Sequence, residues 1–342
     1  MLKKITLFAS ILIGSFSLYG QQEAHFSNLA YNPFILNPAA GGMSDILQIE
    51  TTSRFQWTGY NVGPRSIMIT GNSPVKFGEG SAALQEFNVS DDLLFEAPKA
   101  STGKTKHIIG GKFLNDAIGP FVKTSVYGSY AIHLPFSKKI NFGAGLGLGW
   151  SNFGVNQEKV KLYNEVDITY SGFLGETTAQ NFLDANAGIV FYNDKFFAGV
   201  SMMQAFNNNV VFEDVTTKSN FNRHYFLMSR YRFDTRGDVS YEPSLVAKLV
   251  ANSPLSIDIG TRVIYRNSMW LGIQYRTSNA LLFQVGSTII KNLYLNYAFE
   301  YSTGKIRTAS NSTHEIQLGL YIGNNRNIDK ELKKGNKASQ PE

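Results

Sequence analysis

Cysteine is absent from this chain of 342 residues. Its absence excludes disulfide bonds, metal sites built on thiolates and a lipid anchor on an N-terminal cysteine. Long apolar runs are lacking as well, because no window beyond the N-terminal leader contains 18 uncharged apolar residues. A membrane-spanning helix needs about 20 such residues, so the sequence predicts none.

Histidine is scarce, and the motifs that mark catalytic or metal sites are missing. No HxH or HExxH pattern and no G-x-S-x-G elbow occurs. The five histidines are more simply explained as lone polar or interfacial residues: His25, His107, His133, His224 and His314. We therefore expect no enzyme, and no catalytic residue, metal ion or cofactor.

A large excess of charge of either sign is also missing. The formal net charge is +6, and loss of Lys3 and Lys4 with the leader would leave 30 basic and 26 acidic residues, a charge of +4. The basic residues do not cluster on any recognisable helix. Nucleic acid is therefore not an expected partner.

The N-terminus has the pattern of a secretory signal peptide. A basic start, Met-Leu-Lys-Lys, precedes an apolar run from Ile5 to Tyr19, which Gly20 and two glutamines follow. This run is too short to span a membrane, and nothing caps it as a buried N-terminal helix, the alternative interpretation. We expect residues 1–20 to be removed after Gly20 and the chain to be exported.

Apolar and polar residues alternate through most of the last third of the chain. Between Leu293 and Tyr301 the odd positions are apolar, whereas the even positions include Asn296 and Glu300. Successive side chains of a strand point to opposite faces, so such a segment has one apolar and one polar face. A soluble sandwich would alternate too. The export signal, the 31 glycines and the many aromatic residues favour a membrane β-barrel.

The predicted fold is an all-β, antiparallel, up-and-down transmembrane barrel of the outer-membrane type, with about 14 strands in residues 46–323. An even number of strands, most of them near the 9–11 residues that span a membrane, is typical of this class. Residues 21–45 are expected to form a periplasmic, plug-like segment, and residues 324–342 a polar tail. The candidate strands are 46–56, 64–73, 106–115, 120–133, 139–152, 181–192, 195–205, 221–233, 240–251, 255–266, 269–277, 280–290, 292–302 and 313–322.

The lengths of the connections predict the orientation of the barrel. Outer-membrane barrels keep periplasmic turns short and external loops long. With a periplasmic N-terminus, the long stretches 153–180, 206–220 and 303–312 all face outside. Residues 74–105 break the rule as a long periplasmic insertion, which is either a contact element or tolerated loop growth.

The strand phase also predicts the residues that face the lumen. These side chains either fill and stiffen the lumen or line a permeation path: Arg230, Arg232, Asp258, Arg262, Arg266, Gln274, Arg276, Glu300 and Glu315. The strand from Ile140 to Trp150 differs, because its inward positions after Asn141 are all glycine. Either the N-terminal segment, a folded loop or a partner chain lies against this bare wall, or an aromatic side chain of a neighbouring strand does.

Residues 22–42 contain two Asn-Pro pairs, and these are the most distinctive feature of the chain. The pairs are Asn32-Pro33 and Asn37-Pro38, five residues apart. The residue before a proline avoids the helical region, so the segment cannot be a continuous α-helix.

A second motif follows, Arg-Phe-Gln-Trp-Thr-Gly, with a proline downstream. It contributes Arg54, Gln56, Trp57, Gly59 and Pro64. Together with the Asn-Pro pairs, it closely resembles the opening of the PorP/SprF family of type IX secretion system membrane proteins.

Three further stretches agree with that family, and two segments depart from it. The agreeing stretches are 115–120, 193–201 and 313–319, so the resemblance spans almost the whole expected mature chain. The departures are the long 74–105 connection and the tail at 324–342.

The resemblance implies a barrel in the outer membrane of a Gram-negative bacterium that assists type IX export or surface anchoring of cargo, linked to gliding motility. It implies three kinds of partner: adhesin-like secreted cargo recognised through its C-terminal domain, periplasmic secretion components, and outer-membrane lipid. The candidate partner-binding residues are Asn32, Pro33, Asn37, Pro38, Arg54, Gln56, Trp57, Gly59, Pro64, His314 and Glu315.

Simpler explanations of these residues remain open. Trp57 is either a docking residue of the first external loop or an aromatic residue of the membrane interface. The Asn-Pro pairs either contact a partner or only shape the entry of the chain into the barrel. For the whole protein, the alternative function is a passive porin or a channel for hydrophobic solutes.

Overall fold

The structure is a computed structural model. The predicted signal peptide, the tail at 324–342 and most of the 74–105 connection lie outside the residues that it describes. The described residues are 25–60, 63–78, 81–84, 103–160, 179–210, 219–251, 253–290, 292–310 and 312–322.

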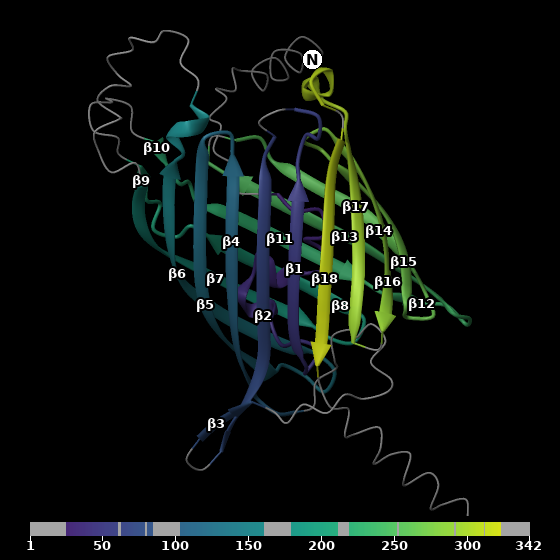
Figure 1. The fold of residues 1–342 in the computed structure, drawn as a ribbon. Coiled ribbons are helices and arrows are strands. Elements are labelled where there is room, and N and C mark those ends of the chain that lie inside the picture. Colours follow the sequence, from purple (N-terminus) through teal and green to yellow (C-terminus); the bar gives the residue numbers. More distant parts are fainter. Residues whose placement is uncertain are drawn as a thin grey trace, which may run out of the picture.

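Fourteen antiparallel strands form a closed barrel, because β1 pairs with β2 on one side and with β18 on the other (Figure 1). The predicted fold class is confirmed. The barrel strands are β1 (Leu47–Phe55), β2 (Arg65–Gly78), β4 (Lys106–Ile118), β5 (Phe121–Pro135), β6 (Asn141–Val155), β7 (Ala179–Tyr192), β8 (Phe196–Met203), β11 (His224–Tyr231), β13 (Val239–Val250), β14 (Ser256–Tyr265), β15 (Met269–Arg276), β16 (Ala280–Ile290), β17 (Leu293–Ser302) and β18 (Ser312–Ile322).

Short elements decorate the barrel at its ends and inside it. No helix of the described residues is long and apolar enough to cross a membrane. The short strands and 3-10 turns are β3 (Ser81–Leu84), β9 (Asn209–Val210), β10 (Ser219–Asn220), β12 (Phe233–Asp234), η1 (Pro33–Ile35), η2 (Pro38–Ala40), η3 (Gln157–Lys159) and η4 (Lys305–Thr308).

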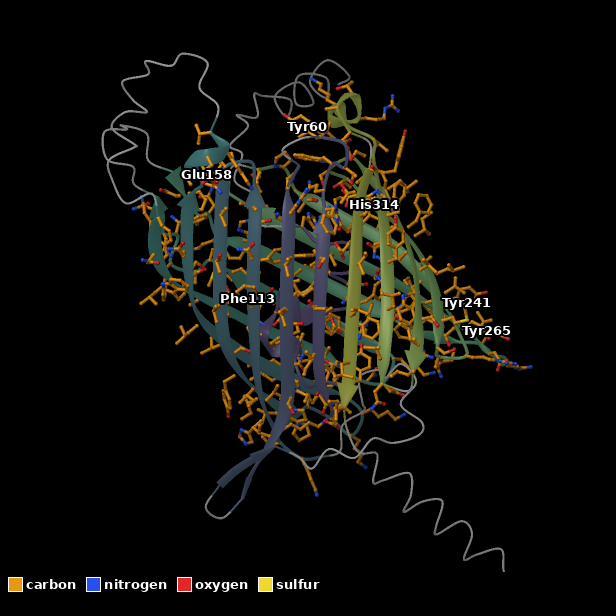
Figure 2. The ribbon with its side chains drawn as sticks, in the orientation of Figure 1. Tyr60, Phe113, Glu158, Tyr241, Tyr265 and His314 are labelled. Carbon is orange, nitrogen blue, oxygen red and sulfur yellow. The ribbon has the colours of Figure 1, made fainter. Side chains whose placement is uncertain are left out.

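Apolar side chains cover the outer face of the barrel, as Figure 2 shows for Phe113 and Tyr241. Leu183 and Leu271, for example, are 70% and 65% exposed. Exposure of so many large apolar side chains is favourable only where lipid, not water, surrounds the barrel. In β17, Asn296 and Glu300 are buried inside, whereas Leu295 points outward. The phase predicted for this strand is therefore correct.

The outward phase of β17 leads to a prediction about Leu295. An arginine there would lie against lipid, so Leu295→Arg is expected to lower the free energy of unfolding in vesicles by about 2–4 kcal/mol. Urea unfolding monitored by tryptophan fluorescence measures this change. The control, Thr303→Arg, places the same charge just beyond the end of β17 and should cost about 0–1 kcal/mol. Equal losses in the two variants would contradict the lipid-facing position.

The prediction that Arg266 faces the lumen is wrong. Strand β14 ends at Tyr265, and Arg266 and Asn267 form the following turn with φ values of 49° and 52°. Side chains alternate between the two faces only within a strand, so the even position of Arg266 does not place its side chain in the lumen. Its side chain is 63% exposed and its Nε donates to Asp238 at 2.8 Å.

The barrel interior is filled by residues 25–46, which we call the luminal segment. Most of its side chains are buried, among them Phe26, Leu36 and Ala39. Pro33 and Pro38 begin the two 3-10 turns of the segment, since proline is tolerated at a helix start but interrupts any longer helix.

The luminal segment lies between an apolar and a charged half of the barrel wall. Strands β2, β4, β7, β8, β11 and β13 turn apolar residues such as Met68, Phe197 and Met228 toward it, and these form the main core. Strands β1, β13, β14, β15, β17 and β18 carry most of the buried charged residues, whereas Lys112 and Asp116 of β4 and Asp184 of β7 lie in the other half. We call the half with most of these charges the charged wall.

Both explanations of the glycine-rich strand β6 hold, at different positions. A side chain at Gly145 would meet the backbone of Ala39, in the luminal segment, at 2.6 Å. At Gly149 it would meet the ring of Tyr127, from the neighbouring strand β5, at 2.3 Å.

Candidate functional site

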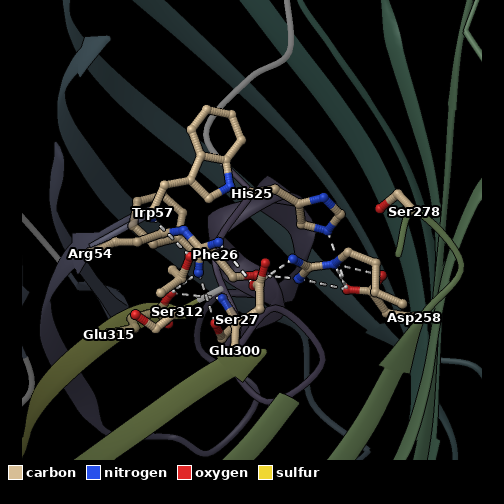
Figure 3. Close-up of polar contacts among 12 residues, drawn as sticks. His25, Phe26, Ser27, Arg54, Trp57, Asp258, Ser278, Glu300, Ser312 and Glu315 are labelled. Carbon is tan, nitrogen blue, oxygen red and sulfur yellow. Dashed lines mark hydrogen bonds and ion pairs between the residues drawn. The ribbon is translucent and has the colours of Figure 1, made fainter. Parts of the chain in front are cut away.

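Arg54 is the centre of the charged wall. It projects inward from β1 and is 2% exposed. Its two Nη atoms contact Glu300 at 2.9 Å and Glu315 at 3.2 Å, and Nη1 also donates to Ser27 Oγ at 2.9 Å (Figure 3). The Arg54 guanidinium of β1 therefore joins β17, β18 and the luminal segment.

Arg276, from β15, extends this network along the charged wall. Its Nη1 lies 2.8 Å from Glu300 and its Nη2 lies 3.0 Å from Asp258. The same Nη2 donates to the carbonyl oxygen of Phe26 at 3.3 Å. Charges buried in this way need partners, and here both signs alternate along neighbouring strands.

His25 marks the N-terminal end of the luminal segment and lies 3.2 Å from Asp258. Burial of the imidazole, together with the positive charge of Arg276, lowers the pKa of His25 to about 4. The ring is therefore neutral at neutral pH, and the contact with Asp258 is a polar contact of an uncharged imidazole.

Side chains of the charged wall also bind the backbone of the luminal segment. Glu315 accepts a hydrogen bond from the backbone N–H of Ser27 at 2.8 Å, and Gln284 donates to the carbonyl oxygen of Ser27 at 3.1 Å. Asn28 donates to Gln317. A buried backbone without secondary structure needs such partners, and the strands supply them.

The two Asn-Pro pairs fix the middle of the luminal segment to opposite walls. Asn32 donates to Glu50 of β1. The Asn37 amide donates to the carbonyl oxygens of Ile189 and Val200, both at 3.1 Å, and its own oxygen accepts the backbone N–H of Ala39. Asn37 is fully buried.

Glycine at position 188 makes this approach of Asn37 possible. A side chain at Gly188 would lie 2.0 Å from Asn37 Oδ1, so only glycine permits the contact. Gly188 could not be predicted from the sequence, because β7 lacks the repeated glycines that mark β6.

A second charged cluster holds the other flank of the segment. Glu242 pairs with both Arg230 and Arg262, and Arg262 lies 3.9 Å from the centre of the Tyr31 ring. A cation over an aromatic face is attractive, and here it positions the ring. A cavity of about 40 Å³ lies between this flank of the segment and the wall, with room for a few water molecules at most.

The second sequence motif lies at the barrel rim, in the turn between β1 and β2. The backbone N–H of Gln56 donates to the carbonyl of Pro64 at 2.9 Å, which closes the turn. Trp57 and Gly59 both have positive φ, 55° and 93°, and Trp57 N donates to Thr313 Oγ1 at 3.2 Å. Gly59 is exposed, and Trp57 lies at the Arg54 end of the network in Figure 3.

His314 and Glu315 are adjacent in sequence, but β18 turns their side chains to opposite faces of the barrel wall. Glu315 is buried inside, whereas His314 faces outward and contacts the hydroxyl of Tyr297 at 2.7 Å. The predicted site therefore divides into three places: the lumen, the rim and, for His314 alone, the outer face.

The structure brings six of the predicted residues into the lumen and adds others to them. The six are Asn32, Pro33, Asn37, Pro38, Arg54 and Glu315. The inward charges were visible as alternation in the sequence, but their contacts with the luminal segment were not. The residues of these contacts that are not among the candidate partner-binding residues are Gly188, Asp258, Arg276, Gln284, Glu300 and Gln317.

Fold and lumen together define an outer-membrane β-barrel whose interior is occupied by its own N-terminal segment. No group of three or more potential metal ligands occurs among the described residues. The chain belongs to the PorP/SprF family, since the family model described as type IX secretion system membrane protein PorP/SprF matches residues 18–320. The family and the fold are those of a secretion or transport protein of the bacterial outer membrane, not of a known class of enzyme.

Several solved barrels are similar in shape at low sequence identity. The outer membrane protein Omp33 of Acinetobacter baumannii has a TM-score of 0.43 and 7% identity, and the match covers 82% of this chain and 99% of that one. The toluene transporter TbuX of Ralstonia pickettii has a TM-score of 0.42 and 11% identity, with 84% and 91% covered. The corresponding values for the toluene transporter TodX of Pseudomonas putida are 0.42, 11%, 88% and 95%. No curated protein matches.

Proposed function

We propose that this barrel assists the export or surface anchoring of particular cargo proteins during type IX secretion. The cargo would be adhesin-like proteins recognised through a C-terminal domain, and the role would connect the barrel to gliding motility. Periplasmic secretion components would be further partners. The role is binding and assembly, without turnover of a substrate.

One observation carries the proposal: the lumen is filled by the luminal segment and fastened to it by buried charges. A porin requires a continuous aqueous path, whereas the described part of the segment fills the interior and the two cavities beside it measure about 40 and 20 Å³. A barrel with an occupied interior can act on other proteins through its rims and its outer face.

The turn between β1 and β2 is the contact that we propose for the cargo. It carries the family motif, and Tyr60, Phe55 and Gly59 are exposed there. Aromatic residues contribute a large share of the affinity at protein interfaces. The positive φ of Trp57 and Gly59 gives this turn a fixed shape, which favours specific recognition.

A pull-down from the native cells tests the proposal. The protein is extracted in detergent, and the proteins that accompany it are identified by mass spectrometry. We expect a large secreted protein with a C-terminal sorting domain, together with periplasmic secretion components. Recovery of the barrel alone, from cells that secrete cargo, would contradict the anchoring role.

Trp57→Ala is expected to weaken recovery of the cargo about tenfold or more, the effect of losing about 1.4 kcal/mol. The matched control is Phe136→Ala, since Phe136 is an aromatic residue that is 68% exposed in the turn between β5 and β6, at the opposite end of the barrel. Equal recovery with both variants would exclude the β1–β2 turn as the cargo contact.

A further inference from the structure

The outer face of the barrel contains an apolar groove that the secretion role does not explain. It follows the rungs of the ladder across β5, β6, β7, β8, β11 and β13 and has a volume of about 1060 Å³. Along one rung, Leu146 lies opposite Ala187, Ala187 opposite Met202, and Met202 opposite Tyr225. Ligand pockets have volumes of about 300–1,000 Å³, so the groove is large enough for a lipid-sized molecule.

The groove is hollow because small residues line its floor between larger ones. Ala144, Ala187 and Ala247 face outward there, whereas Leu146 and Leu249 at its edges are more than half exposed. An alanine between leucines leaves a depression in an otherwise even surface.

The luminal segment lies directly behind this floor. The carbonyl oxygens of Ile189 and Val200, two residues of the groove, accept the hydrogen bonds of Asn37 from the inside. Gly145 allows η2, and Gly188 allows Asn37, to touch the inner side of the same wall. The groove is therefore separated from the luminal segment by a single layer of backbone, and its shape is held from within.

The position and lining of the groove indicate its occupant. It lies on the face that is covered by membrane, and nearly all its side chains are hydrocarbon or aromatic. A protein strand would find no free backbone groups to pair with on the face of a sheet, whereas acyl chains need none. An acyl chain gains van der Waals contacts by filling such a depression.

A positive charge, that of Arg223, lies two residues from Tyr225, which lines the groove. Arg223 is exposed, and its Nε donates to the carbonyl of Ala205 at 2.8 Å. That bond restrains the guanidinium at this end of β11. Arginine in such a place binds the phosphate of a lipid headgroup.

We propose that this groove is a binding site for an anionic membrane lipid, with the acyl chains over Ala144 and Ala187 and the phosphate at Arg223. The site is distinct from the rim that we propose as the cargo contact, and it does not depend on the proposed secretion role.

Native mass spectrometry of the delipidated full-length barrel tests this site, with phosphatidylglycerol and phosphatidylcholine of equal chain length as probes. We expect wild type to retain phosphatidylglycerol in preference to phosphatidylcholine. Ala187→Trp fills the groove and should reduce the fraction of barrels that carry lipid about tenfold. Arg223→Gln should remove the preference for phosphatidylglycerol and leave the retention of phosphatidylcholine unchanged.

The matched control is Ala185→Trp, two residues away on the same outward face of β7 but outside the groove, and it should bind lipid like wild type. Heat-dependent migration in gel electrophoresis verifies that each variant is folded, and Ala144→Leu replaces Ala187→Trp if that variant fails to fold. Equal retention by wild type and the folded groove variant would overturn the proposal. A dimer or a bound protein that the groove variant abolishes would also overturn it.

Discussion

Replacement of Arg54 by leucine is expected to lower the free energy of unfolding of the barrel by about 3–5 kcal/mol, the cost of breaking a buried ion pair from one side. Glu300 would keep Arg276 as a partner at 2.8 Å. Glu315 would keep only the backbone N–H of Ser27, so its charge would remain buried without a cation. The luminal segment would also lose the hydrogen bond from Arg54 to Ser27 Oγ.

A double-mutant cycle separates the charge effect from lost packing. Arg54→Leu, Glu315→Leu and the double variant are unfolded by urea in lipid vesicles, with tryptophan fluorescence as the signal. We expect the double variant to recover a large part of the stability that Arg54→Leu loses, because it no longer buries an unpaired carboxylate. Additive losses would show that Glu315 and Arg54 do not stabilise each other.

The barrel itself could be predicted from the sequence because the period of a strand is 2, which ties each residue to a face. Leu295 and Glu300 are on the predicted sides for this reason. The rule fails at strand ends, as Arg266 demonstrates. It also argues against pairing His314 with Glu315 in one site, since neighbours in a strand point apart.

The contacts inside the lumen could not be predicted, because they depend on register and closure. Arg54 and Glu315 are directly opposite each other only because β1 pairs with β18, more than 250 residues away in the chain. Alternation identified Glu315 as an inward charge without indicating its partner, and Arg54 was singled out only as part of the second motif. The inward glycines of β6 indicated that another part of the molecule lies close to this strand. From the sequence, the luminal segment and an aromatic side chain such as Tyr127 explained the glycines equally well.

Gly188 and Asn37 illustrate the same limit on a smaller scale. An isolated glycine in a strand has many explanations, and an Asn-Pro pair predicts only local backbone shape. Their contact joins positions that are about 150 residues apart, and only the closed barrel brings them together. The second Asn-Pro pair is thus explained by contacts with the barrel wall, which no local sequence pattern reveals.

Removal of residues 25–45 is expected to convert the barrel from a closed into a conducting state. The segment occupies the interior between the apolar and the charged half of the wall, and a barrel of fourteen strands without it is close in size to the porins, which leave an aqueous channel. In planar bilayers, we expect wild type to give no resolvable current steps and the deletion variant to give steps like those of a porin.

The matched control is deletion of residues 324–342, a polar terminal segment of similar length, which should leave the bilayer silent. If the shortened barrel does not fold alone, a synthetic peptide of residues 25–45 is added during refolding and washed out before the bilayer measurement, because the wall contacts to Ser27, Asn28 and Asn37 do not require a covalent link. Porin-like steps from wild type would instead favour the passive channel. Silence of both wild type and the folded deletion variant would mean that the wall closes the lumen without the segment.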